Sequence, residues 1–307
     1  MKNEKIMIHF KPLQLSDKKA IDACLQGNTY RACDFCFANL YAWQAKFKTT
    51  FAAEQDTLFI RWKDDEDEFC YTMPVGKMPL EKALKLMLQD ASENQIPFIL
   101  KGITLRMWDD IEKAMPGVFD YRHDSCNDEY IYFSKRLIEL SGRKLQSKRN
   151  HINRFKKENP DWHYVPLASE ADLRACGEML DEWENLNLSK AEKSLRYDYI
   201  ASKIMLENYE YLGLRGAALK AKGRIAAFTL GERLTDDTFV VHVEKAYSGM
   251  NGAYALINQQ FVAHEAAKYT YINREEDMGL EYLRKAKQSY YPDMLLQERI
   301  LRVKEGR

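Results

Sequence analysis

The segment from Asn273 to Pro292 gathers ionisable side chains of both signs beside an apolar strand, and its sequence is NREEDMGLEYLRKAKQSYYP. Three acids stand before the glycine, and three bases and a pair of adjacent tyrosines stand after it: Glu275, Glu276, Asp277, Arg284, Lys285, Lys287, Tyr290 and Tyr291. Carboxylates of this kind can hold an ammonium group by charge-assisted hydrogen bonds, and cations can hold phosphates. The alternative is a helix over 280–287 whose acids and bases only complement its macrodipole.

A second group of candidates lies on the predicted strand Thr238–Ala246. Because side chains alternate between the two faces of a strand, Val240, His242 and Glu244 are predicted to share one face. A histidine and a carboxylate two residues apart can supply a general base near neutral pH. The alternative is that both face solvent, opposite an apolar face, and the sequence favours neither interpretation.

The strand is followed by a glycine loop, 248–252, that leads into a predicted helix over 253–268. Gly249 and Gly252 would let backbone N–H groups at the helix N-terminus bind a phosphate. Taken alone, the spacing is more typical of an ordinary strand-to-helix turn. The sequence contains no P-loop, GxGxxG, HExxH or GxSxG motif. This excludes the commonest classes of nucleotide-binding protein, metalloprotease and hydrolase.

The segment Lys135–Lys157 is strongly basic, with nine lysines and arginines against one acid, Glu139. Gly142 is predicted to separate two helices within it. Asn150 and Asn153 are poor residues for a helix interior, so their amides are candidates for specific hydrogen bonds. Most charge runs are solvated helix faces, and that alternative applies here. In a neutral protein, however, such a segment is also what a localised phosphate site would look like.

Length and composition bound the class of protein. A chain of 307 residues predicts two domains. Its 46 basic and 46 acidic residues give a net charge of zero, so the protein as a whole has no electrostatic attraction to nucleic acid or to a membrane. The six cysteines show no disulfide or zinc spacing, with Cys33-x-x-Cys36 as the one close pair, so no metal site is predicted. We expect reduced thiols, a cytoplasmic protein and no integral membrane segment, because no apolar run reaches the length of a membrane span.

The hydrophobic pattern alternates helices and strands in both halves of the chain. Helices are expected at 34–47, 79–94 and 105–115, and strands at 57–62, 68–73 and 98–101. In the second half, helices are expected at 169–183 and 191–209, and a hairpin at 214–234 turns at Lys222-Gly223. The sequence therefore predicts an α+β fold with mixed sheets in two similar blocks.

Three segments together resemble a known family. They are DEYIYFSKRLIELSGRKLQSKRNHINRF (Asp128–Phe155), GERLTDDTFVVHVEKAYSGMNGAYALINQQF (Gly231–Phe261) and the segment from Asn273 to Pro292. They are similar to the phosphatidylglycerol lysyltransferase C-terminal domain family. DFCFANLYAW (Asp34–Trp43) and MPVG (Met73–Gly76) fit the same family, so the resemblance covers nearly the whole chain.

The resemblance implies two tandem GNAT-like domains, 1–133 and 159–307, joined by basic connecting helices over 134–158. Characterised relatives move an aminoacyl group from charged tRNA to an acceptor, and they are similar in fold to the Fem aminoacyltransferases. This chain differs from lipid-modifying relatives in that no membrane-embedded portion is predicted. Tyr282 also stands where a small residue is expected.

The resulting hypothesis is an acyltransferase that uses aminoacyl-tRNA and needs no cofactor. Glu244 or Asp277 would be the general base, and His242 is the further candidate for this role. Glu275 and Asp277 could also bind the donor's ammonium group. The predicted substrate-binding residues are Lys148, Arg149, Asn150, Asn153, Asn273, Glu275, Arg284, Lys287 and Tyr290. The alternatives are an N-acyltransferase that uses acyl-coenzyme A and a non-catalytic module that binds RNA or a phosphorylated metabolite. The sequence sets neither the acceptor nor the oligomeric state.

Overall fold

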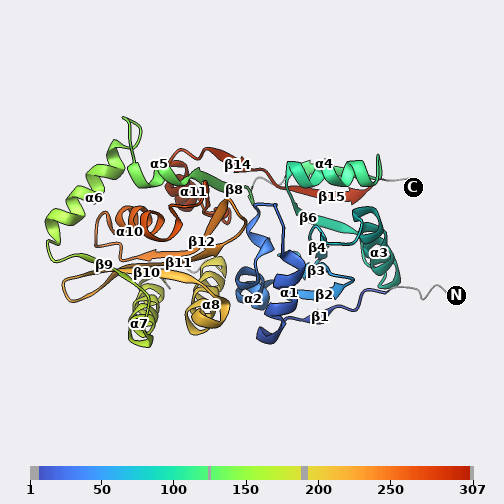
Figure 1. Ribbon diagram of the computed structural model, residues 1–307, viewed down its shortest axis with the longest axis horizontal. Coiled ribbons are helices and arrows are strands. Elements are labelled where there is room, and N and C mark those ends of the chain that lie inside the picture. The colour runs from blue at the N-terminus through green and yellow to red at the C-terminus, as the bar shows by residue number, and fades with distance from the viewer. Residues whose placement is uncertain (1–6, 124–125, 188–192, 305–307) are drawn as a thin grey trace. The chain divides into compact units, whose positions relative to one another are not determined.

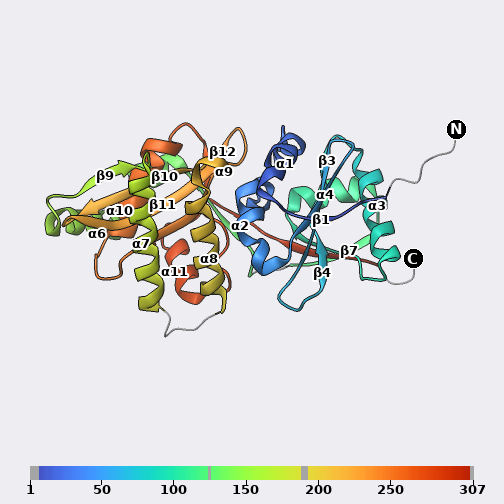
Figure 2. The same cartoon turned by 90° about the horizontal axis from the view of Figure 1, so that it is seen from below.

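The computed structural model describes residues 7–123, 126–187 and 193–304, and the chain forms two compact units. Unit 1 contains Met1–Glu129 and Leu296–Arg307, and unit 2 contains Tyr130–Leu295. Each unit is built on one mixed sheet that carries helices (Figure 1, Figure 2). The predicted α+β class with two mixed-sheet domains is therefore confirmed.

Unit 1 has an eight-stranded sheet in the order β1-β2-β3-β4-β6-β15-β7, with β5 paired to β3. Its strands are β1 (Lys11–Pro12), β2 (Thr50–Glu54), β3 (Thr57–Lys63), β4 (Phe69–Tyr71), β5 (Val75–Gly76), β6 (Ile99–Ile103), β7 (Phe119–His123) and β15 (Arg299–Val303). Its helices are η1 (Leu15–Asp17), α1 (Lys18–Leu25), η2 (Cys33–Phe35), α2 (Phe37–Phe47), α3 (Leu80–Glu93) and α4 (Leu105–Ala114). Helix α3 forms where expected, because Ala83, Leu84, Met87 and Ala91 make one buried face.

Unit 2 has a seven-stranded sheet in the order β14-β8-β13-β12-β11-β10-β9. Its strands are β8 (Glu129–Phe133), β9 (His163–Pro166), β10 (Arg215–Ala221), β11 (Arg224–Arg233), β12 (Thr238–Ala246), β13 (Tyr271–Asn273) and β14 (Met294–Leu296). Its helices are α5 (Ser134–Glu139), α6 (Gln146–Glu158), α7 (Glu170–Asn187), α8 (Lys193–Glu207), α9 (Tyr209–Leu212), α10 (Ala253–Phe261), the π-helix η4 (Val262–Ala266) and α11 (Glu281–Gln288). Strand β13 runs parallel to β12, with the glycine loop and α10 between them in sequence. This is the strand, loop, helix and strand order expected of a GNAT-like domain.

Helices cover both faces of the unit 2 sheet. In Figure 1, α6 and α10 lie above strands β9 to β12, whereas α7 and α8 lie below them. The thin apolar stripe of the basic segment, Leu145, Ile152 and Phe155, belongs to the buried core shared by α6, α10 and the sheet. The basic segment is therefore an integral layer of unit 2, held by burial of its apolar side chains.

The unit boundaries differ from the predicted domains in two respects. The predicted connecting helices, 134–158, become α5 and α6 of unit 2, because Leu137 and Phe155 are buried in its core. The chain end does not belong to the second domain, since β15 pairs with β6 and β7 in the sheet of unit 1. Pairing between strands so distant in sequence leaves no local pattern, so the sequence alone could not reveal it.

Candidate functional site

Polar side chains from separate segments of unit 2 lie close to one another. Lys148 comes from α6, Glu244 from β12 and Asn258 from α10. Arg274 directly follows β13, and Tyr290 follows α11. We call Lys148, Tyr132, Glu244, Asn258, Arg274 and Tyr290 the Lys148 cluster. It contains residues of the basic segment, of strand β12 and of the segment from Asn273 to Pro292.

An ion pair lies at the centre of the Lys148 cluster. Arg274 donates from Nη2 to Glu244 Oε1 at 2.9 Å, and Asn258 Nδ2 donates to Glu244 Oε2 at 3.0 Å. The Arg274 and Glu244 side chains are only 11% and 12% exposed. A buried pair of this kind fixes the direction of both groups, because each would be costly to leave without its partner.

Lys148 lies over an aromatic ring beside this pair. Its Nζ is 4.0 Å from the Tyr290 ring centroid, and Arg274 Cζ is 4.9 Å from the same centroid. Tyr132 packs edge-on against Tyr290, with 6.3 Å between centroids. Burial, and next the charge of Arg274, lower the pKa of Lys148 to about 8, although Glu244 acts in the opposite direction. Among the residues that the structure describes, no carboxylate forms an ion pair with Lys148.

Two buried polar atoms of the Lys148 cluster lack a hydrogen-bond partner within the described part of the chain. They are Nη1 of Arg274, a donor, and Oδ1 of Asn258, an acceptor. Buried polar atoms are nearly always paired in folded proteins, so unpaired ones indicate a place for a ligand or water. The cluster can thus bind an oxygen that carries negative charge together with a neighbouring hydrogen-bond donor.

His242 does not join Glu244 in this cluster, which corrects the predicted strand face. The pairing of β12 with β11 shifts between Leu230 and Gly231, which face Val243 and Val241, so His242 is an extra residue in a β-bulge. After the bulge, Glu244 points to the α10 side, whereas His242 binds Glu232 and Glu275. Its Nε2 lies 3.1 Å from Glu232 Oε1 and its Nδ1 lies 2.7 Å from Glu275 Oε1. Both ring nitrogens are therefore engaged.

Asp277 is a fully bonded carboxylate. It accepts hydrogen bonds from Tyr130 Oη at 2.7 Å, from Arg284 Nε and Nη2 at 2.8 and 3.1 Å, and from Gly279 N at 2.9 Å. Burial alone would raise the pKa of Asp277, but the hydrogen bonds from Arg284, Tyr130 and Gly279 hold it below its ordinary value. Such a carboxylate is a weak base with no free lone pair, so the predicted base and ammonium-binding roles do not fit its geometry.

We expect Asp277→Asn to lower the free energy of unfolding by about 2 kcal/mol at pH 7, because it removes the charge-assisted hydrogen bonds between Asp277 and Arg284. The folded-state pKa of Asp277 is depressed, so its contribution is complete above the unfolded-state value of about 3.9 and is lost as pH falls through the folded-state value. Urea unfolding of both proteins between pH 7 and about pH 2.5 measures the difference. Asp236→Asn, at a 96% exposed side chain, is the control. A difference that stays constant over this range would contradict the assignment.

The other residues of the segment from Asn273 to Pro292 shape its backbone. Asn273 Oδ1 accepts from Glu275 N at 2.7 Å, and Glu275 has a positive φ of 58°. Lys287 is buried and donates to the carbonyls of Arg274, at 2.6 Å, and of Glu276. These contacts hold the turn from which the Arg274 side chain extends. Asn273 and Lys287 therefore stabilise the backbone of this turn.

Three predicted substrate-binding residues of α6 lie outside the Lys148 cluster. Arg149 donates to the carbonyls of Leu140 and Gly142 and to Gln146, so its guanidinium closes the turn between α5 and α6. Asn150 is exposed and accepts from Gln146 Nε2 at 2.9 Å, and Asn153 is also exposed. Their positions result from helix geometry, which turns them away from the face that carries Lys148.

The glycine loop packs against α6. Gly252 has a φ of +91°, and a Cβ atom placed on it would lie 2.1 Å from the carbonyl oxygen of His151. Gly249 is exposed, and a Cβ there would meet nothing within 4 Å. Close approach of two backbones therefore explains Gly252, and the predicted phosphate loop is not needed to account for it.

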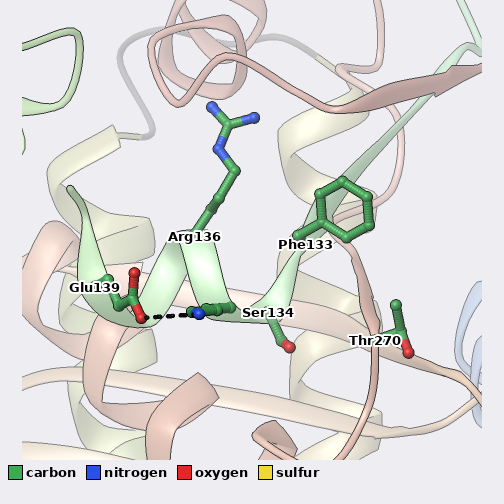
Figure 3. A pocket seen from close by; sticks show the side chains of 6 residues that line it. Phe133, Ser134, Arg136, Glu139 and Thr270 are labelled. Atoms are coloured by element: carbon green, nitrogen blue, oxygen red, sulfur yellow. Dashed lines mark ion pairs between the residues drawn. The ribbon is translucent and has the colours of Figure 1, made fainter. Parts of the chain in front are cut away.

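Two surface hollows lie away from the Lys148 cluster. In unit 2, a pocket of about 390 Å³ surrounds the start of α5 and is lined by Phe133, Ser134, Lys135, Arg136, Glu139 and Thr270. Figure 3 shows the side chains that line this pocket, and a dashed line marks the ion pair of Glu139. Lys135 Nζ lies 3.7 Å from Glu139 Oε1. In unit 1, a pocket of about 240 Å³ lies between 24–30 and 73–83. Neither contains a predicted site residue.

Sequence reasoning missed Arg274 and Asn258, although both carried a signal. Arg274 stands inside NREEDMG, where the neighbouring acids drew attention away from it. Asn258 lies in the interior of α10, where asparagine is unfavourable, and Asn150 and Asn153 carry the same signal in α6. A buried asparagine among apolar helix residues was the better indicator.

Comparison with known proteins assigns the family. Residues 29–300 match the family described as "Phosphatidylglycerol lysyltransferase, C-terminal". The chain is 38% identical to a conserved protein of unknown function from Bacteroides thetaiotaomicron, with a TM-score of 0.90 over 97% of this chain and 100% of that one. The chain therefore belongs to the phosphatidylglycerol lysyltransferase C-terminal family, which confirms the resemblance.

The chain is also similar to more distant proteins. L-PGS from Bacillus licheniformis is 16% identical and shares the fold, with a TM-score of 0.66 over 99% of this chain and 95% of that one. An uncharacterised protein of Mycoplasmoides gallisepticum is 26% identical over 255 residues, which is 78% of each chain. Among the helices that the structure describes, none combines the length and apolar character that crossing a bilayer requires.

Proposed function

We propose that this chain is a cytoplasmic acyltransferase that moves an aminoacyl group from charged tRNA to an amine or hydroxyl acceptor, with the Lys148 cluster as its active site. The observation that carries this proposal is the pair of unpaired buried atoms in the Lys148 cluster, Arg274 Nη1 and Asn258 Oδ1. Acyl transfer passes through an oxyanion, which a fixed donor such as Arg274 stabilises. The aminoacyl ester is already activated, so no covalent enzyme intermediate is required.

The basic segment supports an RNA donor. Arg143, Lys144 and Lys157 are exposed on α6, the helix that also carries Lys148, and on the turn that precedes it. Lys144 Nζ lies 5.3 Å from the Tyr291 ring centroid, so a cation and an aromatic ring are presented together. Lysines and arginines grouped in this way bind phosphate backbones, and exposed aromatic rings stack on bases.

Acceptor-dependent deacylation tests the proposal. Purified protein is incubated with a mixture of charged tRNAs, first alone and then with a cell extract that supplies acceptors. We expect deacylation that depends on both protein and extract, and that falls steeply as salt rises, because phosphate contacts are screened. Thermal stabilisation by coenzyme A thioesters, with none by tRNA and no deacylation, would favour acyl-coenzyme A as the donor instead.

A further inference from the structure

The base required by an acyl transfer is not among the residues that the sequence suggested. Asp277 accepts four hydrogen bonds, and both ring nitrogens of His242 face carboxylates. Glu244 is held by Arg274 and Asn258. A base must have a free lone pair that can reach the acceptor, so another group has to take the proton.

Lys148 is the titratable group of the cluster whose nitrogen remains available within the described residues. The charged and titratable groups that face it are Arg274 after β13, Glu244 on β12 and Tyr290 after α11. Burial raises the pKa of the Tyr290 phenol, so this ring stays neutral near pH 7. Burial and Arg274 lower the pKa of Lys148 to about 8, so a substantial fraction is neutral amine at physiological pH.

We infer that Lys148 is the general base of the transfer and that Arg274 binds the oxyanion beside it. This inference rests on the proposed function. Neutral Nζ takes the proton from the acceptor as its oxygen or nitrogen attacks the ester carbon. A bond forms to that carbon, and the carbonyl electron pair moves to the oxygen near Arg274 Nη1. The intermediate then collapses, the bond to the tRNA ribose breaks, and Lys148 returns its proton to the ribose oxygen.

Chemical rescue tests the base. We expect Lys148→Ala to lower the transfer rate by about 100- to 1000-fold. Added methylamine and ethylamine should restore part of the rate, with a pH dependence that follows the added amine. Lys148→Arg keeps the charge but cannot release a proton near neutral pH, so it should be as slow as Lys148→Ala. Near-normal rates in Lys148→Arg, or rescue by sodium chloride as good as by amines, would overturn the inference.

Lys285→Ala is the control for the transfer assay. It removes an exposed cation of α11 and should leave the transfer rate unchanged.

A second measurement of Lys148 does not depend on activity. NMR titration of ¹³C-methylated wild-type protein, assigned with Lys148→Arg, should show one lysine that titrates near pH 8. An ordinary pKa of about 10.4 at Lys148 would overturn the inference even if transfer occurs. If the wild-type protein transfers no aminoacyl group but the pKa of Lys148 is lowered, the proposed function is wrong. The conclusion that Lys148 can accept a proton near neutral pH would still hold.

Discussion

Replacing Arg274 by methionine is expected to lower the free energy of unfolding by about 3 kcal/mol, because it leaves Glu244 buried without its cation. The Arg274 and Glu244 side chains are both nearly buried, and the pair sits between α10 and the sheet. Urea unfolding at pH 7 gives the difference. The effect should be among the largest for a single substitution in unit 2.

The double variant Arg274→Met with Glu244→Met is the matched control. Because replacing both members of a buried ion pair by apolar residues is often close to neutral, it should recover most of the loss. Lys285→Met breaks the exposed pair with Glu281 and should cost no more than about 0.5 kcal/mol. A double variant as unstable as the single one would show that the cost does not come from an unpaired carboxylate.

Gly252→Ala is expected to destabilise unit 2 by about 3 kcal/mol. The residue combines a φ of +91° with a Cβ position 2.1 Å from the His151 carbonyl oxygen. Alanine would therefore be strained in its backbone and would push α6 away from α10. Thermal and urea unfolding would measure the loss.

Gly249→Ala provides the comparison, since its Cβ would meet nothing and the change should stay within about 0.5 kcal/mol. The two glycines thus distinguish a packing role from a phosphate-binding role in the same loop. If Gly252→Ala were as stable as the wild type and only lost binding to RNA, the packing explanation would be wrong.

The secondary structure of this chain was largely predictable because local patterns determine it. The strand Thr238–Ala246 was predicted with its observed bounds, and the hairpin turns at Lys222 and Gly223, both with positive φ as a tight turn requires. The expected helix over 253–268 ends earlier, at Phe261, and continues as the π-helix η4. The start of the helix expected over 191–209 lies partly outside the described residues.

The arrangement of the site was predictable only in part, because it depends on tertiary contacts. The bulge at His242 arises where Gly231 approaches Val240, since a Cβ on Gly231 would lie 2.3 Å from the Val240 carbonyl oxygen. That one extra residue changes which face His242 occupies, so an alternating pattern predicted the wrong neighbours. Lys148, Glu244 and Tyr290 were predicted as site residues, and that role stays a prediction. The sequence could not show which charges pair with one another inside the protein, because ion pairing depends on contacts between residues distant in sequence.

The most direct test of the central claim follows a labelled aminoacyl group from charged tRNA into a stable product by mass spectrometry, with wild-type protein and Arg274→Lys side by side. Lysine can keep the pairing with Glu244 but lacks the Nη1 donor. We predict labelled product with the wild type and about 100-fold less with Arg274→Lys, while both proteins remain folded. Equal product from the two proteins, or no labelled product from the wild type with any charged tRNA, would contradict the assignment of this site.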